Sequence, residues 1–369
     1  MEFTKRDTLA AKGAAIAIMY VHHMFLSPER YGGFTIDFAP FTDSQVAYVA
    51  AFFKICVGRF VFLSGYGMTM SLKRAKERNS VCHRNMIVRR MTTLMMNYWI
   101  IFFLSLVVSV IISSPHSFQS VYGGGKKGLW YCALDFLGLA DLYQTPTFNA
   151  TWWYMSLAIL IIFLMPLLYQ FWSRYSYCLL GVVLLLPRAL DLPVTNITRW
   201  GLALVLGIIC ADTNLLGRLK GSFAKSSRLV KLLAAAAMTG VMLLFVIMRQ
   251  SPIGSDFIDV FDSVIPAYAV AYVSILLTGI PGVGAILVFL GRHSMNLFMF
   301  HTFFRDYFWK KYIYGFKCAW LDLLLLFVST LLVSIVLEQL KKRLGFYRLI
   351  DRILKKTITT DAVPQRSDN

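Results

Sequence analysis

Charged side chains are scarce in this sequence. Asp, Glu, Lys and Arg make up only 15% of its 369 residues, whereas 57% are hydrophobic and the mean hydropathy is +0.62. A chain of this composition cannot keep its apolar side chains inside one water-soluble globule. The length alone would suggest two soluble domains, but the composition excludes them and predicts an integral membrane protein.

Acidic residues are the scarcer charged class. The chain has 19 Asp and Glu residues against 37 Lys and Arg residues, which gives a formal net charge of +18. The basic residues lie mainly between hydrophobic stretches, on alternate connections, as the positive-inside rule describes for membrane proteins. Because the sequence has no separate basic domain to wrap a polyanion, the charge does not indicate a nucleic-acid partner.

Cysteine is also sparse. No two of the six cysteines form a Cys-x-x-Cys pair, so we expect neither a metal site nor a redox site. The sequence also lacks a glycine-rich nucleotide loop, a His-Glu-x-x-His motif and a Gly-x-Ser-x-Gly motif, which excludes the enzyme classes that depend on them. The cysteines are Cys56, Cys82, Cys132, Cys178, Cys210 and Cys318.

What the sequence does contain is ten hydrophobic stretches, each near the roughly 20 residues that cross a bilayer. We expect an all-α integral membrane domain over residues 8–340, with about ten transmembrane helices and no soluble domain. A basic cytoplasmic tail is expected over residues 341–369, with disorder in its polar final residues, Thr357 to Asn369. The stretches are residues 8–27, 46–72, 91–112, 152–171, 176–190, 197–213, 229–248, 260–280, 285–305 and 319–340.

The connections between the stretches predict the orientation. Residues 73–90, residues 214–231 and the tail are rich in Lys and Arg, and they fall on the same side of a ten-span arrangement. The positive-inside rule places this side, and therefore both termini, in the cytoplasm. The longest connection on the other side, residues 113–151, is too mixed to span. We expect it either to lie in the interface or to fold back as a lid.

The first stretch carries three ionisable residues, Lys12, His22 and His23. An ionisable group in a membrane helix costs roughly 2.5–3.5 kcal/mol, so it usually faces a protein interior or a water-filled cavity. The separation between Lys12 and His23 returns an α-helix to nearly the same face, about 16 Å further along. Both groups could therefore face one pathway. In the alternative, Lys12 extends to the lipid headgroups and a histidine packs structurally.

Further stretches show recognisable patterns. Residues 60–67 read Phe-Val-Phe-Leu-Ser-Gly-Tyr-Gly, in which Gly65 and Gly67 allow helices to approach closely. Ser64 in the same stretch could hydrogen-bond across a helix interface, or it could simply pack. The other patterns are a basic loop with Arg84, Arg89 and Arg90 that leads into Asn97-Tyr98-Trp99, residues 151–156 with Trp152 and Tyr154, and residues 291–301 with Ser294 and His301.

Together with the spacing of Lys12 and His23, these patterns resemble the acyltransferase-3 family of integral-membrane O-acyltransferases, over nearly all of residues 8–340. The chain departs from the family's pattern at three positions. Lys12 and Arg59 stand where arginine and an apolar residue, respectively, are usual. Thr93 stands where the second arginine of an Arg-x-x-Arg motif is usual.

The resemblance implies an enzyme of a bacterial cell membrane that moves an acyl group, most often acetyl, from acyl-coenzyme A to a hydroxyl. The acceptor is a surface polysaccharide or its lipid-linked precursor, and glycan-assembly machinery is a possible partner. His23 is then the general base, because the unperturbed histidine pKa of about 6.5 suits proton abstraction at neutral pH. No permanently bound cofactor and no metal are expected. The donor-binding candidates are Lys12, Arg84, Arg89 and Arg90, and the other site candidates are Arg59, Ser64, Trp152, Tyr154, Ser294 and His301.

A second interpretation is a transporter or flippase for a lipid-linked sugar or a small anion, with Lys12, Arg59 and His23 along its path. Binding of acyl-coenzyme A, and acylation that depends on His23, would distinguish the two interpretations. A membrane scaffold without chemistry would leave the ionisable residues of the first stretch unexplained.

Overall fold

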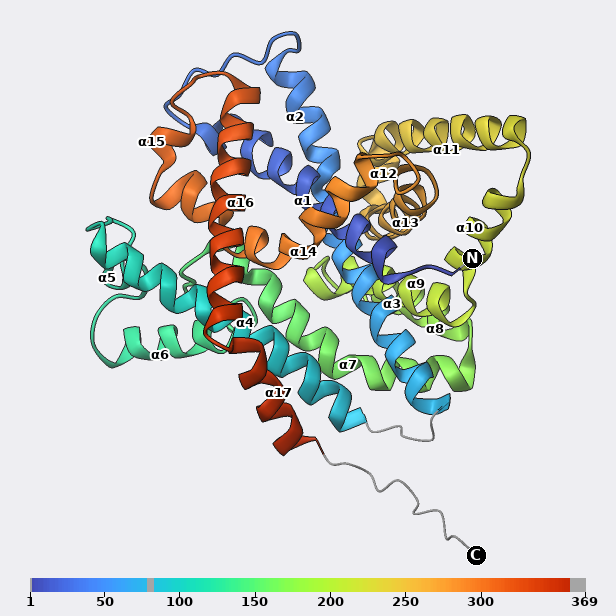
Figure 1. The fold of residues 1–369 in the computed structure, drawn as a ribbon, viewed down its shortest axis with the longest axis horizontal. Helices are drawn as coiled ribbons and strands as arrows, with labels where there is room; N and C mark the ends of the chain where they lie inside the picture. The colour runs from blue at the N-terminus through green and yellow to red at the C-terminus, as the bar shows by residue number, and fades with distance from the viewer. Residues whose placement is uncertain (1, 78–82, 359–369) are drawn as a thin grey trace, which may run out of the picture.

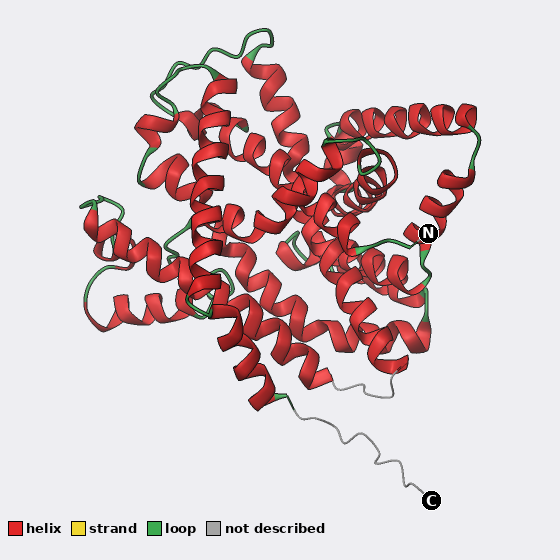
Figure 2. Ribbon diagram, viewed as in Figure 1, coloured by secondary structure: helices red, strands yellow, loops and turns green. Residues whose placement is uncertain are grey.

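The protein is a bundle of α-helices. The computed structural model describes residues 2–77 and 83–358, and within these ranges it contains one isolated β-bridge, between Asp37 and Cys318, and no strand (Figures 1 and 2). The longer helices are α1 (Lys5–Phe25), α2 (Asp43–Phe52), α3 (Cys56–Glu77), α4 (His83–Ile111), α7 (Trp153–Tyr175), α9 (Asn196–Asp212), α11 (Arg228–Arg249), α13 (Ile258–Tyr272), α14 (Val283–Thr302) and α16 (Ala319–Arg343). The shorter helices are α5 (Phe118–Tyr122), α6 (Gly125–Phe136), α8 (Cys178–Ala189), α10 (Leu215–Lys225), α12 (Pro252–Asp256), α15 (Lys310–Ile313) and α17 (Phe346–Thr357).

Short 3-10 and π-helical segments connect or extend these helices. The 3-10 segments are η1 (Pro28–Tyr31), η2 (Phe53–Ile55) and η3 (Ala150–Trp152), and the π-helical segments are η4 (Val273–Leu277) and η5 (Phe303–Tyr307). The segments η4 and η5 extend α13 and α14 directly. A π-helical turn inside a longer helix often lies at a functional site.

Seven helical segments of the described chain are long and apolar enough to cross a membrane, so the chain is a multi-pass membrane protein. The pair α9 and α10, bent by 60°, would make an eighth. All ten predicted stretches are helical, but the prediction of ten spans is not met in full. Helix α8 has only 12 residues, and α1 has a lower mean hydropathy because it carries Lys12, His22 and His23. The seven segments are Asp43–Glu77, His83–Ile111, Ala150–Tyr175, Arg228–Arg249, Ile258–Leu277, Val283–Tyr307 and Ala319–Arg343.

Helix α1 lies in the interior of the bundle and runs parallel to α14. Two glycines allow the backbones to touch. A Cβ atom on Gly13 would lie 1.9 Å from the Leu287 carbonyl oxygen, and one on Gly291 would lie 1.9 Å from the Leu9 carbonyl oxygen. Nearer the end of α1, the Tyr20 hydroxyl lies 2.8 Å from the Thr330 hydroxyl of α16. The helix that carries the ionisable residues is therefore fixed along its length.

Helix α3 packs against α9 through a similar contact. A Cβ atom on Gly65 would lie 2.4 Å from the Leu204 carbonyl oxygen, and one on Gly207 would lie 2.3 Å from the Phe62 carbonyl oxygen. The prediction that Gly65 brings helices close is confirmed. The same prediction for Gly67 is wrong, because the nearest atom to a Cβ there is a side-chain nitrogen of Arg90, at 3.9 Å.

A buried carboxylate joins the three helices α9, α11 and α13. Asp262 of α13 receives hydrogen bonds from Arg199 of α9 at 2.8 Å and from Arg249 of α11 at 2.6 Å. Arg249 also donates to the carbonyl of Ala51 at 3.0 Å. This charge cluster is hydrogen-bonded throughout, which is the condition under which buried charges are tolerated.

The long connection 113–151 folds back along α4. Trp99 stacks on Phe136 of α6 with ring centroids 4.9 Å apart, and its Nε1 donates to the Phe136 carbonyl at 2.9 Å. Buried Asp135 accepts hydrogen bonds from the Tyr122 hydroxyl and the Phe148 backbone N–H, both at 2.6 Å. Folding back was one of the two predicted arrangements for this connection.

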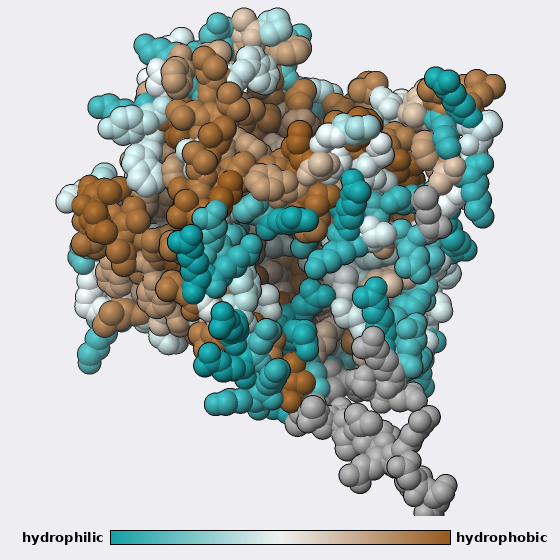
Figure 3. All heavy atoms as spheres, in the orientation of Figure 1, coloured by the Kyte–Doolittle hydropathy of each residue, from teal (hydrophilic) through white to brown (hydrophobic). Residues whose placement is uncertain are grey.

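The first three residues of the expected basic tail are the end of α16, and a separate helix follows. Helix α17 is amphipathic, and its buried residues Phe346, Ile350 and Leu354 pack against the start of α4. Hydrophilic side chains gather around this end of the molecule in Figure 3. The segment predicted to be disordered, from Thr357 onward, falls mostly on residues 359–369, which lie outside the described residues.

Candidate active site

A cavity of about 1020 Å³ lies inside the bundle. Its walls come from α1, α3, α4, α7, α14, α16 and α17, so segments far apart in the sequence enclose it. Figure 3 shows the molecule hollowed between α16 and α3, with hydrophilic side chains around the opening. None of residues 113–149 lines the cavity. The connection 113–151, for which a lid was one expectation, therefore packs along α4 and does not cover the cavity.

The cavity joins two chemically distinct ends. At the end where α4 begins, it is lined by Arg89, Arg90 and Arg292. At the end where α1 finishes, it is lined by His22 and His23. Five basic residues and one acidic residue line the whole space, so its electrostatic field attracts an anionic ligand. The basic residues are Lys12, Arg30, Arg89, Arg90 and Arg292, and the acidic residue is Glu338.

Lys12 and His23 both line this cavity, one nearer each end. Helical spacing predicted that the two side chains share one face of α1, and the structure places them along the same wall. The alternative in which Lys12 extends to lipid headgroups is not what the structure shows, because Lys12 borders the internal cavity.

The two neighbouring histidines differ in their hydrogen bonds. His22 Nδ1 lies 2.7 Å from the Ala50 carbonyl oxygen, a contact that holds the ring against α2. His23 Nδ1 is buried and has no hydrogen-bond partner within the part of the chain that the structure describes. An unpaired buried nitrogen is costly unless a ligand or water satisfies it. Among the described residues, the structure therefore holds the His22 ring through a backbone carbonyl and leaves Nδ1 of His23 without a partner.

His301 lies beside His23 but does not line the cavity. The centroids of the His23 and His301 rings are 4.9 Å apart, and the Tyr20 ring centroid lies 5.4 Å from that of His301. His301 Nδ1 lies 2.9 Å from the Phe298 carbonyl oxygen, within its own helix. The ring therefore supports His23 from the protein side.

Arg305 is a site residue that the sequence patterns did not reveal. It lies in the π-helical segment η5, is 2% exposed, and donates a hydrogen bond to the backbone carbonyl of His23. It also pairs with Asp306, while its Nε has no partner among the described residues. The one available signal was a buried arginine at the end of an apolar stretch. Its contact with His23 joins residues 282 positions apart, which no local pattern can predict.

A second set of contacts that was not predicted surrounds Lys341, near the basic end of the cavity. Lys341 is 2% exposed, and its Nζ lies 2.9 Å from Glu338 Oε1, 2.9 Å from Asn97 Oδ1 and 3.1 Å from Asn296 Oδ1. Glu338 also accepts a hydrogen bond from Tyr347 of α17. These contacts tie α4, α14, α16 and α17 together around the cavity.

The remaining predicted residues divide into two sets. Ser64, Tyr154 and Ser294 line the cavity, although the Ser64 hydroxyl donates to the Phe60 carbonyl of its own helix at 2.8 Å. Three others do not line it. Trp152 is buried and donates to the Met299 carbonyl at 2.9 Å, Arg59 is buried elsewhere in α3, and Arg84 is exposed on α4.

Two other observations bear on Arg59 and on metals. No ion pair of Arg59 is present within residues 2–77 and 83–358, and its buried Nε has no hydrogen-bond partner there. In the same residues, no group of three or more His, Cys, Asp or Glu side chains could hold a metal ion.

Comparison with known proteins gives a family match. The family model described as an acyltransferase domain matches residues 10–339, which include the whole cavity except its edge on α17 and Ile358. No curated protein matches the chain, and no solved structure does. Because the matched residues make up most of a multi-pass helical bundle, the chain belongs to the acyltransferase-3 family and is a membrane acyltransferase.

Proposed function

We propose that the protein is an O-acyltransferase that moves an acyl group, most often acetyl, from acyl-coenzyme A to a hydroxyl of a surface polysaccharide or its lipid-linked precursor. The observation that carries the proposal is one cavity that joins a cluster of cations at one end to His23 at the other. Within the described residues, Nδ1 of His23 has no hydrogen-bond partner. A long anionic donor with a reactive thioester at its far end suits this arrangement.

The donor's phosphates bind at the basic end. Arg89, Arg90 and Arg292 line that end, and Lys12 lies further in. Guanidinium groups suit this role because they bind phosphate through paired hydrogen bonds. Arg84 lies outside the cavity lining and contributes only to the long-range field that attracts the donor.

The chemical step takes place at the histidine end. The acceptor hydroxyl oxygen attacks the thioester carbonyl carbon while the neutral imidazole of His23, which lines the cavity, takes the hydroxyl proton. The tetrahedral intermediate collapses, the carbon–sulfur bond breaks, and the proton passes from the imidazolium to the leaving thiolate. Arg305 acts as a positioning residue, because it holds the backbone carbonyl of His23. General-base catalysis of this kind contributes roughly 10²–10⁴-fold to the rate.

We place the enzyme in a bacterial cell membrane with both termini in the cytoplasm. The support for this orientation is the excess of Lys and Arg in residues 73–90, 214–231 and 341–369. The donor then enters from the cytoplasm, and the acyl group is transferred near the opposite face of the membrane. Glycan-assembly machinery that delivers the acceptor is the partner expected there.

Binding of acetyl-coenzyme A tests the donor site directly. We expect the purified protein in detergent to bind it, and the combined change of Arg89, Arg90 and Arg292 to Gln to weaken binding by about tenfold or more. Arg84→Gln is the matched control, because it removes a cation from the same helix outside the cavity. Equal dissociation constants for the wild-type protein and the triple variant would remove these residues from the donor site.

A further inference from the structure

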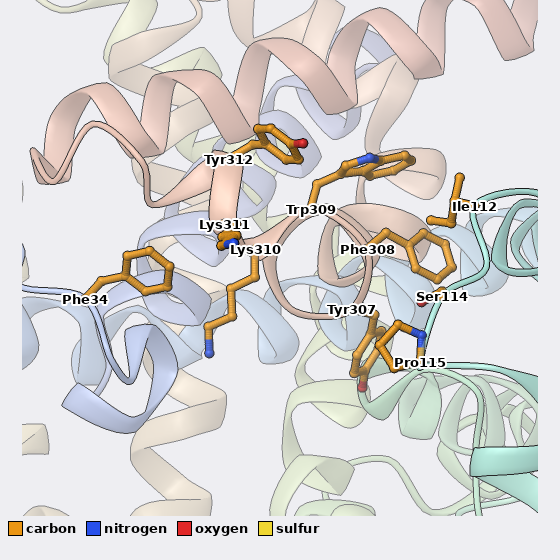
Figure 4. Close-up of a pocket in the computed structure, with 10 residues that line it drawn as sticks. All are labelled: Phe34, Ile112, Ser114, Pro115, Tyr307, Phe308, Trp309, Lys310, Lys311 and Tyr312. Atoms are coloured by element: carbon orange, nitrogen blue, oxygen red, sulfur yellow. The ribbon is translucent and has the colours of Figure 1, made fainter.

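A second pocket lies on the surface near the histidine end. We call it the aromatic pocket; its volume is about 470 Å³, and aromatic rings dominate its walls (Figure 4). In the described chain its lining residues are all different from those of the main cavity. It is formed by Phe34, residues 112–115 except Ser113, and residues 307–312.

The aromatic pocket is close to the proposed site of acyl transfer. Its residue Tyr307 follows Arg305 by two positions, and Arg305 contacts the His23 carbonyl. The Tyr307 hydroxyl also accepts a hydrogen bond from the Ala150 N–H at 3.2 Å, and the next residue, Thr151, lines the main cavity. A molecule in this pocket therefore lies beside the histidine end of the main cavity.

The rings of the pocket are held in place by their neighbours. Tyr307 stacks on His116 with centroids 3.8 Å apart, and Trp309 packs on Phe304 at 4.5 Å. Fixed aromatic rings offer flat apolar surfaces, against which the C–H faces of a sugar ring can pack at low entropic cost. This feature favours a cyclic ligand over a flexible lipid chain.

Two lysines give the pocket a positive charge. Lys310 is half-buried, and in Figure 4 its side chain extends between Phe34 and Tyr307. Lys311 is the next residue and is exposed. Neither forms an ion pair in the portion of the chain that the structure covers, and nearby Asp306 pairs with Arg305 instead. An unpaired ammonium beside apolar rings favours an anionic group on the ligand.

We propose that the aromatic pocket binds an acidic sugar of the acceptor. The sugar ring packs against Tyr307 and Trp309, and its carboxylate or phosphate binds Lys310 and Lys311. This inference rests on the proposed function, since it assumes that the acceptor is a saccharide. It deepens that proposal by naming a negatively charged glycan as the acceptor class.

Equilibrium binding without any acyl donor tests the pocket separately from catalysis. The probes are hyaluronan tetrasaccharide and glucose 1-phosphate, which carry a carboxylate and a phosphate respectively, and neutral chitotetraose. We expect at least one acidic probe to bind the purified wild-type protein and the neutral probe to bind more weakly. The double variant Lys310→Gln with Lys311→Gln should weaken acidic-sugar binding by about tenfold or more.

Matched variants and a lipid arm sharpen the test. Lys126→Gln removes an exposed lysine in α6, away from the pocket, and should bind the acidic probe like the wild-type protein. Sugar binding by the wild-type protein, together with no acyl transfer by that same protein, would refute the proposed function and not the pocket. The inference is overturned if no acidic probe binds, or if the double variant binds it unchanged. It is also overturned if the lysines affect only the binding of short-chain phosphatidylglycerol.

Discussion

At the scale of single residues, what could be predicted depended on whether the partners share one helix. Lys12 and His23 were identified from their spacing because a helix has a fixed period, and both line the main cavity. Arg305 and Lys341 were missed because their contacts join distant parts of the chain or several helices at once. Trp152 was a site candidate because it belongs to the pattern of residues 151–156, but it does not line the main cavity and donates to the Met299 carbonyl instead.

Arg305 provides a prediction at this scale. We expect Arg305→Gln to lower acyl transfer by about tenfold or more, because His23 loses the charged hydrogen bond that holds its carbonyl. The effect should fall on the turnover number, with the Michaelis constant for acetyl-coenzyme A little changed, since Arg305 does not line the donor end of the cavity. Steady-state kinetics on equal amounts of folded protein measure both quantities. A selective rise in the donor's Michaelis constant would contradict the positioning role.

At the scale of elements, the helical stretches were predictable but their contacts were only partly so. All ten predicted stretches are helices because apolar runs of that length have few other structures in a membrane. Residue composition cannot say which glycine meets a neighbouring backbone, so Gly65 was predicted correctly and Gly67 was not. The contact of α1 with α14 was not predicted, because its two glycines are separated by most of the chain.

The crossing of α1 and α14 gives the second prediction. Gly13→Ala and Gly291→Ala each place a methyl group 1.9 Å from a carbonyl oxygen of the other helix, so the helices must move apart. We expect a lower melting temperature in detergent and reduced transfer, because the shift displaces His23 relative to Arg305. Overpacking of this kind costs typically about 1–3 kcal/mol.

Gly240→Ala in α11 is the matched control for these two substitutions. A Cβ atom there has nothing within 4 Å, so the substitution should leave stability unchanged or raise it slightly. If Gly13→Ala is as stable and as active as Gly240→Ala, the two helices do not touch as described.

The third prediction concerns the segment 113–151. Burial raises the pKa of Asp135 above its ordinary value, although hydrogen bonds from Tyr122, Phe148, Thr147 and Tyr98 act in the opposite direction. A carboxyl whose folded-state pKa is raised contributes stability that is fully present below the unfolded-state pKa and is lost as pH rises through the folded-state pKa. The melting temperature should therefore fall as pH rises through that range from about 4.

Asp135→Asn tests this assignment, because the amide does not titrate. The variant should lack this part of the pH dependence. At neutral pH it should also be less stable, by about 1–3 kcal/mol, because an amide nitrogen cannot accept hydrogen bonds from the Phe148 N–H or the Tyr122 hydroxyl. Parallel pH profiles for the variant and the wild-type protein would show that Asp135 is not the titrating group.

At the scale of the whole molecule, composition and charge identified a multi-pass membrane protein, and the residue patterns identified its family. They could not show that one cavity joins the two ends, since its walls come from seven helices. They also could not separate an enzyme from a transporter, because both use ionisable residues along an internal path. That separation depends on the chemistry at the histidine end.

The most direct measurement is acyl transfer from acetyl-coenzyme A by the wild-type protein, His23→Ala and His22→Ala, with the same surface glycan as acceptor and equal amounts of detergent-stable protein. The wild-type protein should transfer acetyl groups, and His23→Ala should be slower by roughly 10²-fold or more, as expected for loss of a general base. His22→Ala should be affected much less, because its ring bonds the Ala50 carbonyl. Near-wild-type transfer by His23→Ala, or its loss in His22→Ala alone, would contradict the account.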